Sequence, residues 1–249
     1  MALIKTAAEI EKMKRSCLIA AEILKEIKKH IRPGIKTSEI NEIAEDLIIK
    51  KGAAPAFKGY RGYKYSTCLS INEEVVHGLP SERRLKDGDI IGVDVGTIVD
   101  GYYGDNAETF PVGNIDAEAE RLLKATREAL AEGISEARDG NHLGDVSHAI
   151  EQVAKKYGFF VVKDLYGHGI GTVMHEDPLI PNYGQKGTGL MLKAGMTIAI
   201  EPMFNAGTEA IKTLEDGWTI VTTDGSLSAH FEHTILITKG RPVILTERR

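Results

Sequence analysis

The stretch GVDVGTIVDGYYGDNA, residues 92–107, places one carboxylate inside an apolar, β-branched run and a second carboxylate after a turn signal. Valine, isoleucine and threonine around Asp94 favour a strand, and Asp100-Gly101 is a dipeptide typical of a tight turn between two strands. The residues from Tyr102 onward then form the returning strand. The stretch therefore predicts a β-hairpin that carries both acidic side chains.

The register of this hairpin determines how Asp94 and Asp105 face each other. With the turn at Asp100-Gly101, Asp94 lies opposite Ala107, and Asp105 is its diagonal neighbour on the same face. With the turn one residue earlier, Asp94 lies directly opposite Asp105. Both registers leave the carboxylates on one side of the sheet, about 5 to 8 Å apart at the backbone. Two like charges that close are costly unless a proton or a cation lies between them.

The composition fits a large folded domain and argues against several other classes of protein. The chain has 249 residues, 42% of them hydrophobic, which is enough for a sizeable core. It has no run of about 18 uncharged apolar residues, so we expect no membrane span. Its first residues precede a charged amphipathic helix, unlike a secretory signal. The two cysteines, Cys17 and Cys68, lack metal or redox spacing, so we expect a reduced, cytoplasmic protein. A net charge of -5 with mixed signs disfavours nucleic acid as a ligand.

Hydrophobic periodicity divides the chain into helices and strands. Thr6 and Glu9 form a capping-box pattern before a helical repeat of apolar residues that extends to Pro33-Gly34. Further helices are predicted over residues 37–51, 116–138 and 143–157. Strand-forming residues are frequent over residues 65–77 and 90–112, and strands resume near residue 159.

The order of helices and strands restarts in the second half of the chain. Residues 85–88 (LKDG) match residues 192–195 (LKAG), and Asp94 matches Glu201 with the same offset of 107 residues. Glycines upstream pair at an offset of 106. This nearly constant offset predicts an α+β fold with two similar halves, residues 1–113 and 114–249, within a single domain spanning residues 1–249. In a pseudo-twofold arrangement, Asp94 and Glu201 converge on a central cleft.

Three further side chains lie where a plain core would not place them. His168 lies in a glycine-rich stretch, Glu201 ends an apolar run, and Glu232 begins another. Each alone is more often a structural or solvated residue, but buried charges require partners. With the two aspartates of the hairpin they provide four carboxylates and one imidazole, which suit two divalent first-row metals bridged by shared carboxylates. Two ions about 3.5 to 4 Å apart hold a hydroxide that attacks a carbonyl or phosphoryl centre.

Two longer motifs accompany these five candidate ligands: NEEVVHGLP at residues 72–80 and SAHFEHT at residues 228–234. Together they resemble the type I methionine aminopeptidases, metallopeptidases of the pita-bread fold, and the resemblance extends over nearly the whole chain. It implies a curved antiparallel sheet covered by helices and formed from two pseudo-symmetric halves. It also implies that Asp94 binds one metal and that Asp105 and Glu232 bridge both. His168 and Glu201 would complete the second metal site.

The resemblance also implies roles beyond metal binding. Glu201 would handle the protons of the attacking hydroxide. His77 resembles the residue that contacts the scissile amide nitrogen, and His175 the one that stabilises the oxygen of the tetrahedral intermediate. Both roles suit acyl transfer, in which charge develops on that oxygen and the leaving amine takes a proton. Without the resemblance, a structural hydrogen bond is an equal alternative for either histidine. His230 departs from the family pattern, which often has glutamine there. The departure makes the contact of this residue with the metal ligands uncertain, but it affects none of the ligands themselves.

A pocket for the substrate side chain is also implied by the resemblance. By similarity, Tyr60, Tyr63, Cys68 and Trp218 line an apolar slot that suits a flexible thioether, because aromatic edges contact sulfur favourably. Met174 stands where relatives often carry phenylalanine, so we expect a softer pocket. An ordinary aromatic strand or loop is the alternative interpretation of the tyrosines.

The predicted activity is removal of the N-terminal methionine from peptides and nascent proteins whose second residue is small. Xaa-Pro aminopeptidases and prolidases share the fold and the five ligands but usually have an extra N-terminal domain. Type II methionine enzymes have a helical insertion between the last two acidic ligands, whereas only 31 residues (232 - 201) separate Glu201 from Glu232. A binding module that has lost its metals is a third alternative, disfavoured because all five ligands are present.

The expected cofactors are two divalent ions, Co, Mn or Fe, because oxygen-rich sites accept these metals alike. The expected partners are peptides and nascent chains that begin with methionine. Any contact with the ribosome would use the folded surface. The size of the chain and the lack of an obvious interface patch favour a monomer, with neither a membrane nor a nucleic acid as a partner.

Overall fold

The hairpin over residues 90–111 is the longest strand pair of the computed structural model, which describes residues 4–247. β4 (Ile90–Val99) and β5 (Tyr102–Pro111) are joined by Asp100-Gly101. Both turn residues have a positive φ, 51° and 79°, as the two-residue turn that matches strand twist requires. Asp94 pairs with Ala107, and Gly96 pairs with Asp105. The first of the two predicted registers is therefore correct, and the carboxylates are diagonal neighbours on one face.

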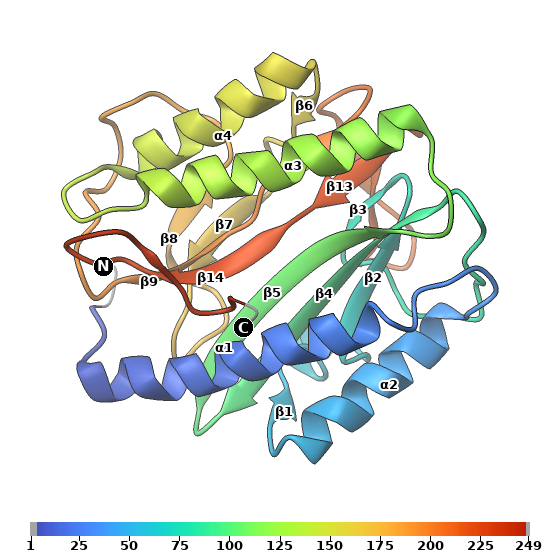
Figure 1. Ribbon diagram of the computed structural model, residues 1–249, viewed down its shortest axis with the longest axis horizontal. Coiled ribbons are helices and arrows are strands. Elements are labelled where there is room, and N and C mark those ends of the chain that lie inside the picture. The colour runs from blue at the N-terminus through green and yellow to red at the C-terminus, as the bar shows by residue number, and fades with distance from the viewer. Residues whose placement is uncertain (1–3, 248–249) are drawn as a thin grey trace.

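Nine strands form one curved sheet, in the order β1-β4-β5-β14-β9-β7-β8, with β2 beside β4 and β15 beside β14. Figure 1 shows β5 and β14 side by side across its middle. The remaining strands of this sheet are β1 (Ala54–Pro55), β2 (Thr67–Ile71), β7 (Tyr166–Gly169), β8 (Glu176–Pro181), β9 (Thr197–Ile200), β14 (Glu232–Leu236) and β15 (Val243–Ile244). Each of its strand pairs is antiparallel.

Two smaller antiparallel sheets of three strands lie beside the large one. The first contains β13 (Ser228–His230), β10 (Met203–Asn205) and β6 (Phe160–Val161). The second contains β11 (Ile211–Thr213), β12 (Ile220–Thr222) and β3 (Glu74–Val76), and β3 leads directly to His77.

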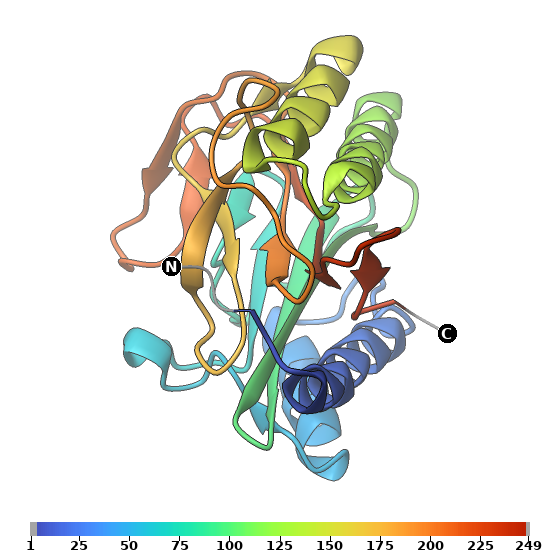
Figure 2. The same cartoon turned by 90° about the vertical axis from the view of Figure 1, so that its left-hand side faces the viewer.

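Helices cover one face of the large sheet, as the two views in Figures 1 and 2 show. They are α1 (Ala7–Ile27), α2 (Thr37–Lys50), α3 (Ala117–Glu136) and α4 (Leu143–Tyr157), close to the predicted ranges. The capping box of Thr6 and Glu9 is present. α1 ends six residues before Pro33, because Lys29 and His30 donate backbone hydrogen bonds to carbonyls three residues back and close a tight turn. Within residues 4–247, none of the helices has the length and apolar character to cross a membrane.

The packing of these helices determines which way the acidic side chains point. Val93 and Val95 belong to the core that α1 and α2 form against the sheet. A side chain at Gly104 would lie 2.6 Å from the backbone nitrogen of Cys17 in α1, so α1 approaches β5 closely there. Because successive residues of a strand point to opposite faces, Asp94 and Asp105 point away from the helices.

The observed architecture confirms the predicted α+β class. The pairs α1 with α2 and α3 with α4 appear in the predicted order, each followed by strands. Asp94 lies inside the ten-residue β4, whereas Glu201 follows directly after the four-residue β9. The boundary between halves at residues 113 and 114 stays a prediction.

Candidate metal centre

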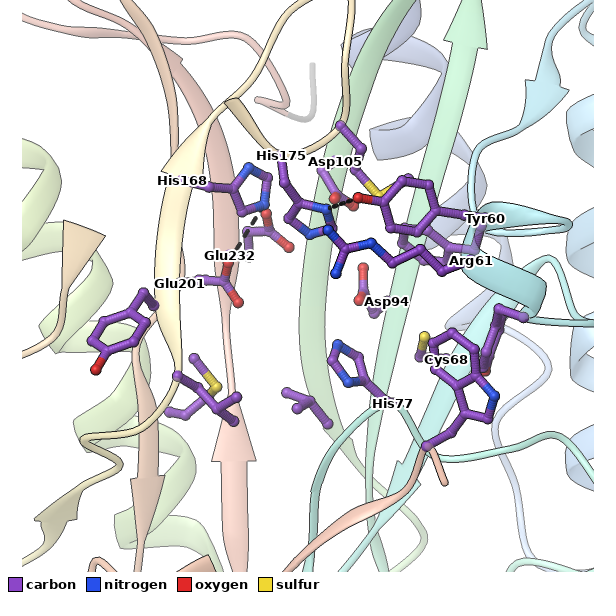
Figure 3. A pocket seen from close by; sticks show the side chains of 18 of the residues that line it. Tyr60, Arg61, Cys68, His77, Asp94, Asp105, His168, His175, Glu201 and Glu232 are labelled. Carbon is purple, nitrogen blue, oxygen red and sulfur yellow. Dashed lines mark hydrogen bonds and ion pairs between the residues drawn. The ribbon is translucent and has the colours of Figure 1, made fainter. Parts of the chain in front are cut away.

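A cavity of about 420 Å³ opens on the face of the large sheet opposite the helices. Figure 3 shows acidic and imidazole side chains from strands on both sides of it pointing toward one another. The cavity brings together all of the residues predicted for ligation, catalysis and substrate binding, namely Tyr60, Tyr63, Cys68, His77, Asp94, Asp105, His168, Met174, His175, Glu201, Trp218 and Glu232. Residues far apart in the sequence therefore share one site.

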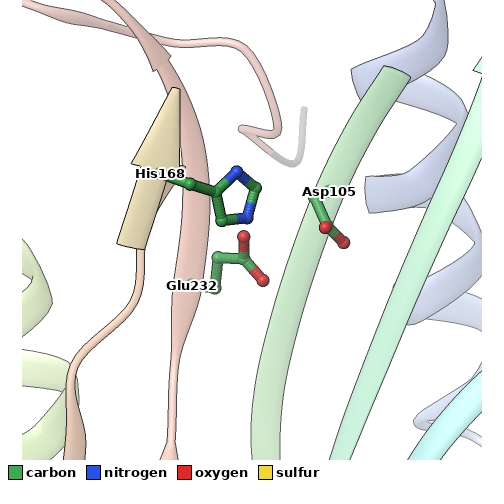
Figure 4. A group of neighbouring side chains, drawn as sticks. All are labelled: Asp105, His168 and Glu232. Carbon is green, nitrogen blue, oxygen red and sulfur yellow. The ribbon is translucent and has the colours of Figure 1, made fainter. Parts of the chain in front are cut away.

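The most compact group in this cavity consists of Asp105, His168 and Glu232 (Figure 4). One potential ligand atom from each lies within 4.8 Å of the others. The three residues are buried, with 5%, 3% and 2% of their surfaces exposed. They come from β5, β7 and β14, three strands of the same sheet. Two carboxylates and an imidazole at this spacing are suited to hold a divalent cation.

Strand pairing explains why these side chains converge. Glu232 pairs with Ala107, so it lies one diagonal step from Asp105 on the same face. The Thr234 hydroxyl accepts from the Asp105 backbone nitrogen and donates to the Asp105 carbonyl, at 3.1 and 2.8 Å. His168 pairs with Ala199, two residues before Glu201. The ladder of β5, β14, β9 and β7 thus fixes the spacing of the group.

The two remaining candidate ligands flank this group. Glu201 Oε1 lies 3.6 Å from His168 Nε2, the pair joined by a dashed line in Figure 3. The imidazole Nδ1 of His168 lies 2.9 Å from the Gly169 carbonyl, which can only accept, so Nδ1 carries the proton. His168 Nε2 is then the atom with a free lone pair, and it faces the carboxylates.

The electrostatics of the site are those of carboxylates crowded together out of water. Burial, followed by the charges of Asp105 and Glu201, raises the pKa of Asp94 well above its usual range. Burial and the same neighbours raise the pKa of Glu232. Burial also raises the pKa of Asp105, to about 6, against the opposing effect of His168. Full ionisation of this cluster therefore requires added positive charge.

Unpartnered oxygens and the donor set of this site fit divalent metal ions. Asp94 Oδ1 and Glu232 Oε1 are buried and have no hydrogen-bond partner within the described part of the chain, residues 4–247. A buried carboxylate oxygen without a partner is costly, and a cation relieves that cost directly. The donor set of four carboxylates and one imidazole nitrogen matches the preferences of first-row divalent ions.

Glu201 differs from the other three acids. Burial would raise its pKa, but the contact with His230 and the nearby imidazoles of His168 and His175 outweigh that effect and lower the pKa. His230 Nε2 lies 3.3 Å from Glu201 Oε2. His230 is itself buried, with 5% of its surface exposed. His230, the residue that departs from the family pattern, thus contacts the carboxylate of Glu201 and favours its ionised form.

His77 enters the cavity from a strained backbone position. It follows β3 and has φ of 59°, a left-handed conformation that is uncommon outside glycine. Any side chain at the next residue, Gly78, would lie 2.2 Å from the Leu69 carbonyl oxygen, so the turn needs glycine there. Burial lowers the pKa of His77. The imidazole is therefore neutral near pH 7 and can serve as a hydrogen-bonding group beside the candidate metal ligands.

His175 reaches the cavity from the loop between β7 and β8. Its ring centre lies 4.4 Å from that of His168. Its Nδ1 lies 2.7 Å from the Tyr60 hydroxyl, as Figure 3 marks. Burial, followed by the proximity of the His168 imidazole, lowers the pKa of His175 to about 4. A neutral imidazole with Nδ1 engaged by Tyr60 leaves Nε2 to interact with a substrate.

An apolar cluster forms the side of the cavity near these histidines. Tyr63, Cys68 and Met174 are buried, with Tyr60 and Trp218 packed against them. The ring centres of Tyr63 and Trp218 are 4.9 Å apart in an edge-to-face arrangement. The single proton of the Tyr63 hydroxyl is shared between the backbone carbonyls of residues 67 and 78, at 3.0 and 3.1 Å, so its polar end is already satisfied. The exposed side of this cluster is therefore apolar.

Sequence reasoning missed several residues that line the same cavity. Arg61 lies between two predicted pocket tyrosines, and its guanidinium carbon lies 5.4 Å from the centre of the Tyr60 ring. Asp164, Tyr166 and Leu179 line the cavity as well. The tyrosine stretch was a usable signal for Arg61, whereas no sequence pattern marks the other three.

Comparisons with known proteins agree with this site. The sequence profile of metallopeptidase family M24 matches residues 11–239. Methionine aminopeptidase 1 of Bacillus subtilis is 51% identical over 246 residues, 99% of each chain. The crystal structure of a methionine aminopeptidase from Thermotoga maritima is 50% identical over 100% of both chains, with a TM-score of 0.98. A prolidase from Pyrococcus furiosus is 25% identical with a TM-score of 0.80, and the match covers 100% of this chain but 66% of the prolidase.

These matches confirm the predicted resemblance to the methionine aminopeptidases. They also confirm the pita-bread fold, since the helices, the curved sheet and the topology are shared over the whole chain. The family is one of metal-dependent peptidases, in agreement with the buried cluster of Asp105, His168 and Glu232. On sequence and on structure alike, this chain belongs to metallopeptidase family M24.

Proposed function

We propose that this chain is a methionine aminopeptidase that removes the N-terminal methionine from peptides and nascent proteins when the second residue is small. The observation that carries this proposal is the juxtaposition of two features in one cavity. A buried metal-ligand cluster of Asp105, His168 and Glu232 lies next to a buried apolar cluster that contains Cys68 and Met174. Relatives about half identical over the full chain are named for this activity.

Two divalent ions are the proposed cofactors, and Asp94, Asp105, His168, Glu201 and Glu232 would hold them. When bound, such a pair lowers the pKa of a shared water and polarises the scissile carbonyl. The buried, partnerless oxygens of Asp94 and Glu232 support this assignment. Co, Mn and Fe all suit the donor set, and metal availability selects among them.

The chain's own side chains would bind and orient the peptide. The neutral imidazole of His175, oriented by Tyr60, donates a hydrogen bond to the substrate oxygen on which negative charge develops. His77, half-buried and neutral, contacts the amide nitrogen of the bond to be cleaved. Glu201, whose pKa the neighbouring histidines lower, accepts a proton and passes it toward the leaving amine.

The apolar cluster provides the proposed slot for methionine. Cys68, Met174, Tyr63 and Trp218 present a mainly apolar surface, and their polarisable sulfur atoms and aromatic edges make favourable contacts with a thioether. Because the slot holds the first side chain and the ligands hold the reacting carbonyl, the second residue lies at the cavity wall. A small second side chain fits that position best.

Two alternatives are less well supported. An Xaa-Pro peptidase is disfavoured because the prolidase is 25% identical with a TM-score of 0.80, whereas the methionine aminopeptidases are 51% and 50% identical and the solved one has a TM-score of 0.98. A non-catalytic binding module is disfavoured because all five candidate ligands line one cavity. We further propose a cytoplasmic monomer with one catalytic domain of two pseudo-symmetric halves. Its partners would be nascent chains, met at the ribosome through the folded surface.

Turnover of two peptides tests this proposal. Metal-stripped protein is given Met-Ala-Ser and Ala-Pro-Ala while Mn, Co or Fe is added back. We expect metal-dependent release of methionine from the first peptide alone, and the most effective metal identifies the best cofactor. Cleavage of the proline peptide alone would move the assignment to the proline-directed enzymes. Tight metal binding without turnover of either peptide would indicate a binding module.

A further inference from the structure

The loop between β7 and β8, residues 170–175, carries Met174 and His175 into the cavity. One side of this loop is tied to the sheet, because the backbone nitrogen of Tyr103 in β5 donates to the Gly171 carbonyl at 2.9 Å. Within the loop, the Gly171 nitrogen donates to the Val173 carbonyl at 3.2 Å. These bonds set the base of the loop but do not reach His175.

Glu176, the residue that follows His175, organises the remainder of the loop. Its Oε1 atom accepts hydrogen bonds from the backbone nitrogens of Thr172 and Val173, at 2.9 and 3.3 Å. Its Oε2 atom accepts a hydrogen bond from Lys5 Nζ at 2.6 Å. One carboxylate therefore closes the loop on itself and joins it to a segment 171 residues away in the sequence.

The ion pair between Lys5 and Glu176 is buried. Only 4% and 9% of the two side chains are exposed. The Lys5 backbone is also fixed, since its nitrogen donates to the Gly195 carbonyl at 2.8 Å and the preceding Ile4 pairs with Met196. Lys5 thus lies on a short strand-like segment that precedes α1, and its side chain contacts the loop at Gly171 and Glu176.

Gly171 makes room for this pair. A side chain there would lie 2.5 Å from Lys5 Cε and 2.6 Å from Glu176 Oε1. The loop and the ion pair are therefore packed in direct contact. A buried pair of this kind adds little net stability, because desolvation offsets the attraction, but it specifies one conformation of the groups attached to it.

We propose that Lys5 and Glu176 are positioning residues that hold His175 in the orientation required for turnover. The proposal rests on the proposed role of His175 at the substrate oxygen. Glu176 directly follows His175 in the chain, so its anchored carboxylate holds the backbone on both sides of the imidazole in place. A misplacement of about 1 Å at a reacting group can lower turnover about 10²-fold.

The test uses Lys5→Met and Glu176→Gln, singly and together, in metal-loaded protein with Met-Ala-Ser as substrate. We expect each single change to lower kcat about 10- to 100-fold, with KM altered less than about threefold and metal content unchanged. Lys14→Met is the matched control. Lys14 also forms a 2.6 Å ion pair, with Glu11, but on the exposed surface of α1. We expect it to leave turnover unchanged.

The double variant separates positioning from the cost of a buried lone charge. Lys5→Met with Glu176→Gln leaves no unpaired charge, so we expect its thermal stability to exceed that of the single variants while kcat stays low. Recovery of kcat in the double variant would overturn the proposal, because the loss in the single variants would then come from the unpaired charge.

A His175→Ala background provides the decisive comparison. If Lys5 acts through His175, Lys5→Met lowers kcat by less than about twofold in that background. A loss as large as in the wild type would overturn the proposal. Failure of the proposed function itself has a different signature, since wild-type protein would then not release methionine, or His175→Ala would leave kcat unchanged.

Discussion

The two walls of the cavity are built in different ways. Asp94, Asp105, Glu232 and His168 lie in or beside hydrogen-bonded strands of the large sheet. His175 lies in a loop, and its partner Tyr60 begins a short 3-10 turn that contains the positive-φ Arg61 (Figure 3). Backbone hydrogen bonds between strands fix the first wall, and a few side-chain hydrogen bonds fix the second.

This difference suggests that the strand wall serves metal binding and the loop wall serves turnover. Backbone ladders of β4, β5, β14 and β7 can hold like charges near one another against their repulsion, because many bonds act together. The loop wall depends on single contacts, such as those of Tyr60 with His175 and of Lys5 with Glu176. Changes in the strand wall should therefore affect metal binding, and changes in the loop wall should affect turnover at constant metal content.

The largest expected effect comes from Asp105→Ala in the strand wall. Loss of the carboxylate that shares the compact group with His168 and Glu232 should abolish metal binding and turnover while the fold remains. Metal analysis after dialysis and release of methionine from Met-Ala-Ser measure both effects. Asp46→Ala, on the exposed surface of α2, is the matched control and should retain full activity. Full activity in Asp105→Ala would refute the ligand assignment.

His175→Ala in the loop wall tests the opposite side of the comparison. We expect kcat to fall about 10²- to 10³-fold, the usual cost of removing a donor to a developing oxyanion. Metal content should equal that of the wild type, because His175 is not a proposed ligand. Steady-state kinetics with parallel metal analysis give the answer. Loss of metal together with activity would show that His175 takes part in metal binding, as the strand residues do, and would contradict the proposed difference between the two walls.

The charge repulsion in the strand wall predicts an unusual pH dependence for metal-free protein. Burial raises the pKa of Asp105 from 3.8 to about 6. A carboxyl whose pKa is raised on folding contributes stability below its unfolded pKa, and that contribution is lost as the pH rises through about 6.

Asp105→Asn removes this contribution and the repulsion. The free energy of unfolding of the variant, relative to wild type, should therefore increase by about 1.4 kcal/mol between pH 5 and pH 7.5. Urea unfolding in the presence of a chelator measures it. Asp46→Asn is the control, and an equal pH dependence in both variants would show that Asp105 carries no such shift.

The smallest predicted effect concerns the bond between Tyr60 and His175. Tyr60→Phe removes one hydrogen bond of 2.7 Å, which is worth about 0.5 to 1.5 kcal/mol, so we expect kcat to fall about two- to tenfold. Tyr157→Phe is a matched control, because the Tyr157 hydroxyl also forms a 2.7 Å bond, to Glu128, away from the cavity. Equal effects of the two substitutions would mean that the bond to His175 has no part in turnover.

Much of the fold was accessible from local sequence signals. The capping box of Thr6 and Glu9 and the Asp100-Gly101 turn act over a few residues, so their structures follow from composition and spacing. The early end of α1 was not predicted, because apolar periodicity continues beyond Ile27 although the chain turns there. Periodicity reports which face is buried, and it does not report where a helix stops.

Some features of the candidate site were likewise predictable from local sequence, and others were not. The type of each ligand was predicted, since acids next to valine and isoleucine are unusual enough to need a cation. The hairpin register was left open between two alternatives, because the turn could begin at either of two residues, and only strand pairing selected Asp94 opposite Ala107. Leu179 was missed as a lining residue, because an exposed side chain carries no periodic signal.

By itself, the sequence determined the fold class, the family resemblance and the chemical type of the ligands, because propensity, turn chemistry and side-chain identity are local properties. The tertiary structure alone decided which carboxylate oxygens of the site are buried without a hydrogen-bond partner among residues 4–247. It also decided that His230 contacts Glu201 and that Lys5 pairs with Glu176, the residue after His175. Those relations join residues as many as 171 positions apart. They arise only when strands pair and exclude water, and no local pattern encodes that step.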